Sequence, residues 1–136
     1  MKKKLKFSRT SVYNIGYHFI WCPKYRRKVL VGRFRKRLKE LLYEKAKQIG
    51  VNIDEMEIMP DHVHLFVKTT PKIAPYGIVK HLKGYSSRIL GLEFSQPLWT
   101  RSYYCESVGH ISEQTVRKYI ASQRENECIK SQPPPS

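Results

Sequence analysis

The sequence contains few acidic residues, few cysteines and no long apolar run. Only 11 aspartates and glutamates stand against 26 lysines and arginines, which gives a formal net charge of +15. This excess of positive charge favours partners that carry negative charge, either nucleic acid or an anionic membrane surface. No apolar stretch approaches the roughly 20 residues that a membrane span requires. We therefore expect no membrane partner and favour nucleic acid.

The three cysteines also limit the chemistry of the chain. Cys22, Cys105 and Cys128 are odd in number and widely spaced, which favours free thiols in a reducing, cytoplasmic setting. A structural zinc site that combined His62 and His64 with cysteine would need paired thiols at close spacing, and the sequence has none. The basic start is not followed by the apolar segment of a signal peptide.

The length of 136 residues fits a single domain, and the sequence holds no repeat and no internal linker. We expect a basic, flexible N-terminus at residues 1–8 and a flexible, proline-rich tail at residues 128–136. The single domain would then occupy residues 9–127.

Hydrophobic periodicity predicts seven elements between the two tails. The strands are expected at residues 12–22, 51–59, 62–69 and 98–108. The helices are expected at residues 33–49, between Pro75 and Gly91, and at residues 112–125. A tight turn at Pro60-Asp61 should join the second and third strands into a hairpin.

The element order β-α-β-β-α-β-α predicts an α+β fold. It fits a ferredoxin-like split βαβ antiparallel sheet with two helices on one face and an extra C-terminal helix that carries Tyr119. In the strand at 62–69, alternate residues should face the helices, whereas His62, His64 and Phe66 should lie on the open face. The last helix could fold across that open face, in its own subunit or in a partner's.

The pattern at residues 62–64 carries the first chemical signal. Alternation along a strand places His62 and His64 on one face, and Tyr119 and Gln123 share a face of a helix because they are four apart. Two imidazoles and an amide oxygen can hold a divalent metal, and a phenol beside it can act as a nucleophile. Ligands of nitrogen and oxygen favour Mg²⁺ or Mn²⁺, although Zn²⁺ or Co²⁺ can also bind. In so basic a chain, the expected electrophile is a nucleic-acid phosphate.

Each part of this pattern has an ordinary structural alternative. A lone His-x-His is often a pair of hydrogen-bonded surface residues, and Tyr119 could simply pack beside Ile120. The phenol is also a poor nucleophile at its usual pKa near 10, unless a metal or the neighbouring Arg117 and Lys118 lower that pKa. The combination of the two motifs favours a catalytic metal site. Asp61 could support that site by contacting a metal ligand rather than the metal itself.

Basic residues that could contact nucleic acid occur in three segments. They lie in the loop after the first strand, at the start of the first helix and just before Tyr119. The candidates are Lys24, Arg26, Arg27, Lys28, Arg33, Arg35, Arg117 and Lys118. Contacts of this kind would position a nucleic acid without reading its sequence.

Together these motifs resemble the single-tyrosine HUH transposases, the TnpA-type enzymes of small insertion sequences that move as single-stranded DNA. Residues 59–65 resemble the family's histidine–hydrophobe–histidine motif, and residues 12–26 resemble its first strand and basic loop. Residues 98–104 resemble its fourth strand, and residues 119–123 match its tyrosine-x-x-x-glutamine helix. The resemblance covers nearly the whole chain, so residues 9–127 would be a single HUH transposase domain.

The resemblance implies that His62 and His64 are metal ligands, with Gln123 as a third. It implies that Tyr119 attacks a DNA phosphodiester, leaves a free 3′-OH and becomes linked to the 5′-phosphate. The implied substrate is single-stranded DNA with subterminal hairpins, and the implied assembly is a homodimer with composite active sites. Such an enzyme would be cytoplasmic, and nucleoid-associated when acting.

Two other functions remain open at this point. A domesticated relative, or a replication-initiator nickase, would keep the chemistry but act on repeated palindromes or replication origins. The presence of one tyrosine in the tyrosine-x-x-x-glutamine motif and the lack of a helicase segment favour a transposase. A non-enzymatic ferredoxin-like module that binds RNA or single-stranded DNA would instead need an RNP-like Lys/Arg-Gly-aromatic run, which the sequence lacks.

Overall fold

The computed structural model describes residues 6–7, 12–91 and 97–108. All of them belong to one compact unit, Lys4–Val108. Residues 109–136, where the C-terminal helix is predicted, lie outside the described residues. The predicted domain boundaries therefore stay predictions. Neither described helix is both long and apolar enough to cross a lipid bilayer.

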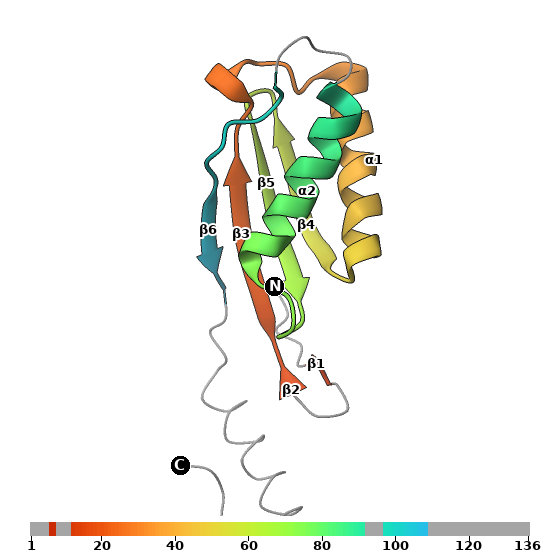
Figure 1. The fold of residues 1–136 in the computed structure, drawn as a ribbon, viewed down its shortest axis with the longest axis vertical. Coiled ribbons are helices and arrows are strands. Elements are labelled where there is room, and N and C mark those ends of the chain that lie inside the picture. The colour runs from red at the N-terminus through yellow and green to blue at the C-terminus, as the bar shows by residue number, and fades with distance from the viewer. Residues whose placement is uncertain (1–5, 8–11, 92–96, 109–136) are drawn as a thin grey trace, which may run out of the picture. The chain divides into compact units, whose positions relative to one another are not determined.

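The described chain forms a four-stranded sheet, two long helices and a small two-stranded ribbon (Figure 1). The elements are β1 (Lys6–Phe7), β2 (Val12–Tyr13), β3 (Ile15–Trp21), the short 3-10 turn η1 (Lys24–Arg26), α1 (Gly32–Ile49), β4 (Asn52–Met59), β5 (His62–Thr69), α2 (Pro75–Leu90) and β6 (Tyr104–Ser107). The strand order in the sheet is β4-β5-β3-β6, and all three pairings are antiparallel.

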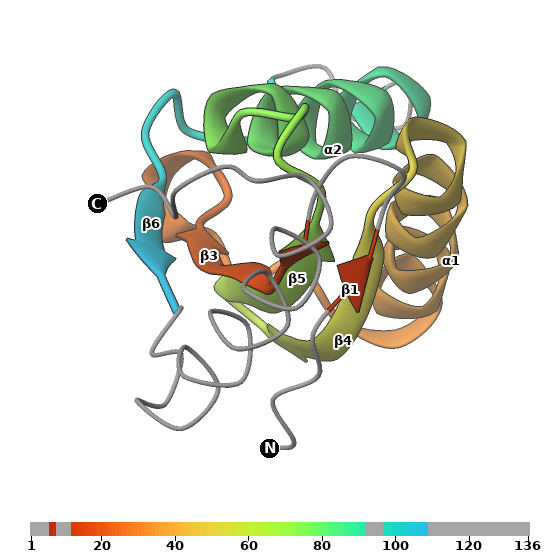
Figure 2. The same ribbon diagram turned by 90° about the horizontal axis from the view of Figure 1, so that it is seen from below.

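Both helices cover the same face of this sheet (Figure 2). The core between them is apolar: Phe19 of β3, Leu65 of β5, Leu42 of α1 and Leu82 of α2 are all fully buried. The strand order and the one-sided helical layer confirm the predicted ferredoxin-like α+β fold.

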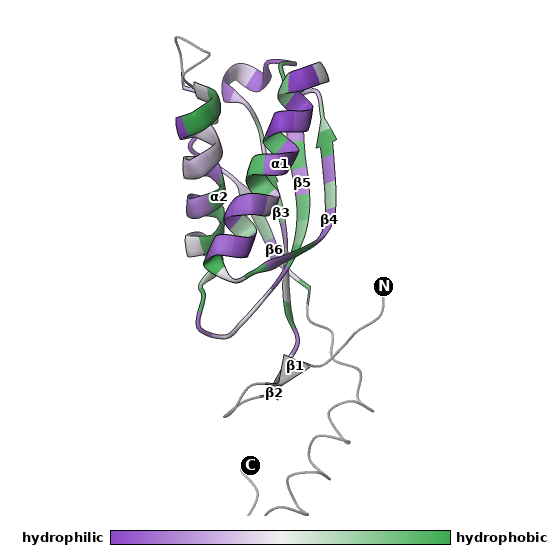
Figure 3. Ribbon diagram, turned by 90° about the vertical axis from the view of Figure 1, so that its right-hand side faces the viewer, coloured by the Kyte–Doolittle hydropathy of each residue, from purple (hydrophilic) through white to green (hydrophobic). Residues whose placement is uncertain are grey.

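Helix α1 forms because its apolar residues recur at helical spacing and face the sheet. Polar residues occupy much of the surface that it presents in Figure 3. The helix ends where Gly50 adopts a left-handed conformation with φ of 81°, and its backbone N–H caps the last turn. Glycine reaches this conformation without steric cost, so the predicted end of the helix is confirmed.

The hairpin that carries the histidines is also confirmed. Met59 of β4 pairs with His62 of β5, which leaves Pro60 and Asp61 as a two-residue turn. A turn this short fixes the register of the two strands. It therefore decides which residues of β5 reach each face.

The predicted first strand, at 12–22, is divided. β2 and β3 are separate strands that flank Asn14, and Asn14 accepts a hydrogen bond from the ammonium of Lys68. β2 pairs with β1, whereas β3 pairs with β5 and β6. The prediction of one continuous strand was therefore wrong, because the two segments belong to different sheets.

The predicted strand at 98–108 was wrong in its first half, since only β6 is a regular strand. The ammonium of Lys83 on α2 donates hydrogen bonds to the carbonyl oxygens of Thr100, at 2.6 Å, and Ser102, at 3.1 Å. These two carbonyls bond to a side chain, and residues 101–103 form no strand. Trp99 forms an isolated antiparallel bridge with Pro23 just beyond β3, and regular pairing with β3 begins at Tyr104.

Candidate active site

Strand β5 presents its two histidines on the face opposite the helices. Val63 and Leu65 are fully buried in the core, while His62 and His64 alternate with them and are half-buried. The predicted orientation of the strand is confirmed. Phe66 shares the histidine face, as expected, but it is buried rather than open.

Gly16 allows the ring of Phe66 to pack directly against the backbone of β3. A Cβ atom at Gly16 would lie only 2.8 Å from the Phe66 ring, which is closer than packed atoms allow. Gly16 of β3 is directly opposite Lys68 of β5, and the Lys68 ammonium lies 5.8 Å from the Phe66 ring centroid. Position 16 therefore requires glycine, because any side chain there would collide with the Phe66 ring.

Asp61 connects β5 to the basic loop that follows β3. Its carboxylate accepts a hydrogen bond of 2.9 Å from Nδ1 of His62 and one of 3.2 Å from Arg26. The hydrogen bond with His62, more than the positive charge of Arg26, holds the pKa of the Asp61 carboxyl below its usual range. A carboxylate bound to one ring nitrogen fixes the orientation of an imidazole and leaves the other nitrogen to meet a ligand. For His62 that other nitrogen is Nε2.

His18 of β3 lies beside the histidine pair, a contact that the sequence-based prediction missed. Its Nδ1 lies 3.3 Å from Nε2 of His64, and the two ring centroids are 5.2 Å apart. The same ring also packs against Phe66 at 4.8 Å. While the contact with His18 persists, Nδ1 is the nitrogen of His64 that remains for a ligand. The available signal was the predicted ferredoxin-like fold, because its split βαβ sheet places the first strand beside the third.

The site needs a further donor to hold a metal ion. Among the residues that the structure describes, no three His, Cys, Asp or Glu side chains converge in that way. His62 and His64 supply two imidazole nitrogens, a donor set that suits a divalent transition metal. Tyr119, Gln123, Arg117 and Lys118 lie outside the described residues, so their roles stay predictions.

The basic loop after β3 contains a turn with an uncommon backbone conformation. Tyr25 and Arg26 both have positive φ values, 62° and 50°, a conformation that costs free energy for residues with a side chain. This turn brings Arg26 to Asp61 beside the histidines. Arg27 instead donates hydrogen bonds to the carbonyls of Lys24 and Pro97. Arg27 thus anchors the loop, whereas Lys28 is exposed.

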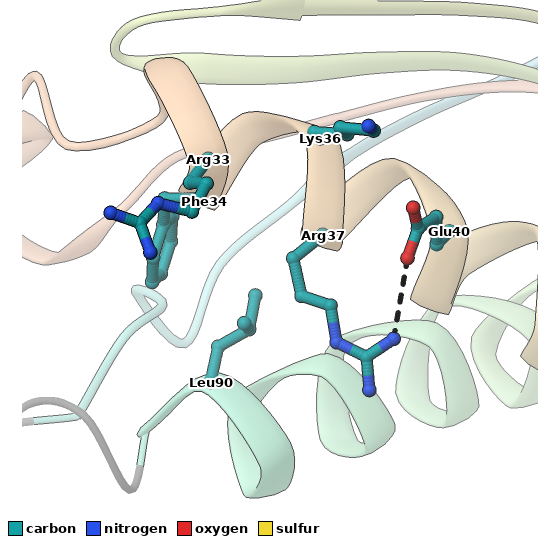
Figure 4. Close-up of a pocket in the computed structure, with 6 residues that line it drawn as sticks. All are labelled: Arg33, Phe34, Lys36, Arg37, Glu40 and Leu90. Carbon is teal, nitrogen blue, oxygen red and sulfur yellow. Dashed lines mark hydrogen bonds and ion pairs between the residues drawn. The ribbon is translucent and has the colours of Figure 1, made fainter.

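The basic residues of α1 lie on the helical side of the sheet. Figure 4 shows the side chains of Arg33 and Arg37 extending from α1 around a pocket of about 530 Å³, with Leu90 of α2 across from them. Arg37 pairs with Glu40 at 3.4 Å. Arg35 donates to the carbonyl of Ile58 at 3.0 Å and so ties the helix to β4. The structure does not bring these residues to the histidine face.

Comparison with known proteins supplies the family context. Residues 11–123 match the model of the family described as "Transposase IS200 like". The chain is 40% identical to the ISDra2 transposase TnpA of Deinococcus radiodurans in an alignment 132 residues long, which covers 91% of this chain and 94% of that protein. It is 30% identical to the transposase of insertion sequence element IS200 from Salmonella typhimurium, with 88% and 84% of the two chains covered.

Solved structures agree with these relationships. A Deinococcus radiodurans R1 protein described as a transposase is 36% identical, with a TM-score of 0.72 over 87% of this chain and 97% of that one. A REP-associated tyrosine transposase bound to a REP hairpin has a TM-score of 0.60 over 92% of this chain and 73% of that one. The second structure is only 13% identical and so supports the fold alone.

Proposed function

The chain belongs to the IS200-like transposase family, and from that premise we propose that it cleaves and rejoins single-stranded DNA with a tyrosine nucleophile and a divalent metal ion. The observation that carries this proposal is the pair of half-buried imidazoles on one face of β5, with Asp61 bonded to His62. The bond from Nδ1 to Asp61 fixes the orientation of the His62 ring and leaves its Nε2 to meet a ligand.

In the proposed site, His62 and His64 hold the metal, and Gln123 supplies a third ligand. The expected ion is Mg²⁺ or Mn²⁺, and of these two the imidazole pair favours the transition metal Mn²⁺. When bound, the ion would polarise a phosphoryl oxygen and offset the charge that develops on it. Asp61 keeps the His62 ring in place, and Arg26 keeps Asp61 in place. These protein groups position the ligands before any DNA arrives.

The proposed reaction is a transesterification at phosphorus. The phenolic oxygen of Tyr119 loses its proton and forms a bond to a DNA phosphorus, while the bond from that phosphorus to the 3′ oxygen breaks. The products are a free 3′-OH and a 5′-phosphotyrosine. Because one ester replaces another, a 3′-OH can later reverse the exchange and rejoin DNA without an external energy source.

The proposed substrate is a single-stranded insertion-sequence end that carries a subterminal hairpin. Two observations support this: the net charge of +15, and the fold shared with a transposase solved with a REP hairpin. The proposed active assembly is a homodimer in which a tyrosine helix completes the site of its own or the partner subunit.

The test is covalent capture of the DNA. The full chain is incubated with Mn²⁺ and a labelled hairpin-bearing strand from the ends of its own element, and an adduct is sought on a denaturing gel. Tyr119→Phe should abolish the adduct and leave binding intact, whereas Tyr43→Phe, an exposed tyrosine on α1, should leave both unchanged. An adduct that persists in Tyr119→Phe would overturn the nucleophile assignment. DNA binding by the wild-type chain without any adduct would favour a non-enzymatic binding module.

A further inference from the structure

A second surface site lies on the helical side of the sheet, at the edge formed by β6. It is a pocket of about 220 Å³ between the first half of α2 and the segment that precedes β6. Its lining residues are Tyr76, Val79, Lys80, Lys83, Arg101 and Tyr103. It contains two tyrosines, three basic residues and one apolar residue, and none of the lining residues from the described chain is acidic.

Lys83 shapes this pocket. Its two hydrogen bonds to the carbonyls of Thr100 and Ser102 hold residues 101–103 out of the strand ladder. Arg101 and Tyr103 on that segment consequently line the pocket. Partial burial lowers the pKa of the Lys83 ammonium, as expected for a cation used inside the structure rather than at its surface.

The two tyrosines expose large aromatic surface. Tyr76 is 61% exposed and Tyr103 is 36% exposed. Each also has an ammonium group near its ring: Lys80 lies 5.7 Å from the Tyr76 centroid, and Lys83 lies 6.0 Å from the Tyr103 centroid. Exposed rings beside cations are the combination that binds single-stranded nucleic acid, because bases stack on the rings while the cations meet the phosphates.

From this geometry we propose that the pocket binds one unpaired nucleobase of a single-stranded DNA substrate, with Tyr76 and Tyr103 as stacking surfaces and Lys80 and Arg101 as phosphate contacts. The inference rests on the proposed function and adds a binding subsite to it. The volume is below the roughly 300 Å³ at which small-molecule pockets begin, which suits one planar base. A base in a duplex is stacked and paired, so it could not enter.

The site is separate from the proposed chemistry. His62 and His64 lie on the opposite face of the sheet from α2, which lines the pocket. A loss of stacking should therefore weaken DNA binding without changing the rate of cleavage at saturating DNA. This separation allows the subsite and the proposed nucleophile to be tested independently.

The experiment measures binding of the full chain to one labelled oligonucleotide, as a single strand and as a blunt duplex, by fluorescence anisotropy. Tyr76→Ala and Tyr103→Ala should each weaken single-strand binding about tenfold, the effect of losing one stacked base. Duplex binding should not change, and Tyr76→Phe and Tyr103→Phe should retain the wild-type affinity. Tyr43→Ala, which removes an exposed tyrosine from α1 outside the pocket, is the matched control.

Several results would overturn the inference. Unchanged single-strand binding, an equal loss for duplex and single strand, or a change in self-association measured by sedimentation would each exclude base stacking in this pocket. Circular dichroism melting curves identify any variant that fails to fold. Adduct formation at saturating DNA separates the two proposals: the pocket variants should retain it, and Tyr119→Phe should lose it while binding DNA normally.

Discussion

At the scale of single residues, the turn between β4 and β5 matters because Asp61 bonds to two groups at once. Its carboxylate orients His62 through a hydrogen bond of 2.9 Å and also accepts a hydrogen bond of 3.2 Å from the Arg26 guanidinium. The pair with Arg26 is exposed and adds little stability by itself. Its value is geometric, since it restrains the carboxylate that restrains the imidazole. Among the described residues, Asp61 is thus the group that would orient His62 toward the proposed metal ion.

This role predicts the behaviour of Asp61→Asn. The amide is uncharged and is a weaker acceptor for the His62 N–H, so the affinity for Mn²⁺ should fall by about 10- to 100-fold. Isothermal titration of the full chain with Mn²⁺ would measure the change. Asp54→Asn, an exposed substitution on β4, should leave the affinity unaltered. Equal Mn²⁺ affinity in Asp61→Asn and the wild type would show that this carboxylate does not support the metal site.

At the scale of elements, the sequence predicted what depends on local periodicity. The two long helices, the hairpin at Pro60-Asp61 and the alternation on β5 all follow from the spacing of apolar residues and from turn chemistry. Long-range contacts could not be predicted in this way. The approach of His18 to His64 depends on the register between β3 and β5, and the irregular segment before β6 depends on the distant Lys83. The pocket that contains Tyr76 and Tyr103 therefore could not be predicted from the sequence.

The connection between α2 and the segment before β6 can be tested with Lys83→Met. The variant leaves two backbone carbonyls without their ammonium donor and should destabilise the fold by about 1–3 kcal/mol. Lys39→Met, on the exposed surface of α1, should change stability little. Urea denaturation would measure both. Because the folded pKa of Lys83 is lowered, the unfolded chain binds more protons at alkaline pH.

The stability of the wild type relative to Lys83→Met should therefore rise as pH increases from that lowered value toward the unfolded value near 10.4. A relative stability that falls or stays constant over this range would contradict the burial of the ammonium. A loss of single-strand affinity in the same variant would connect the backbone irregularity to the pocket that it shapes.

At the scale of the whole molecule, positive charge is distributed over both sides of the sheet. Arg26 lies beside the histidines, whereas Arg33 and Arg37 lie at the pocket between α1 and α2. A net charge of +15 attracts DNA at long range through any of these surfaces. Direct phosphate contacts can be told from this general attraction, because each contact releases counterions and adds to the salt dependence of binding.

Arg33 and Arg35 form an informative pair for that measurement, since they lie two residues apart on α1. The Arg35 side chain is bonded to the carbonyl of Ile58, whereas Arg33 lines the pocket with Lys36 and Arg37. If Arg33 contacts a phosphate, Arg33→Gln should reduce the slope of log K against log salt by about 0.7 for a single strand. Arg35→Gln should leave the slope unchanged and instead lower the melting temperature, because it releases α1 from β4. Binding titrations over a range of NaCl concentrations give both slopes. Identical slopes in Arg33→Gln and the wild type would exclude Arg33 from the DNA interface and confine the contacts to other basic surfaces.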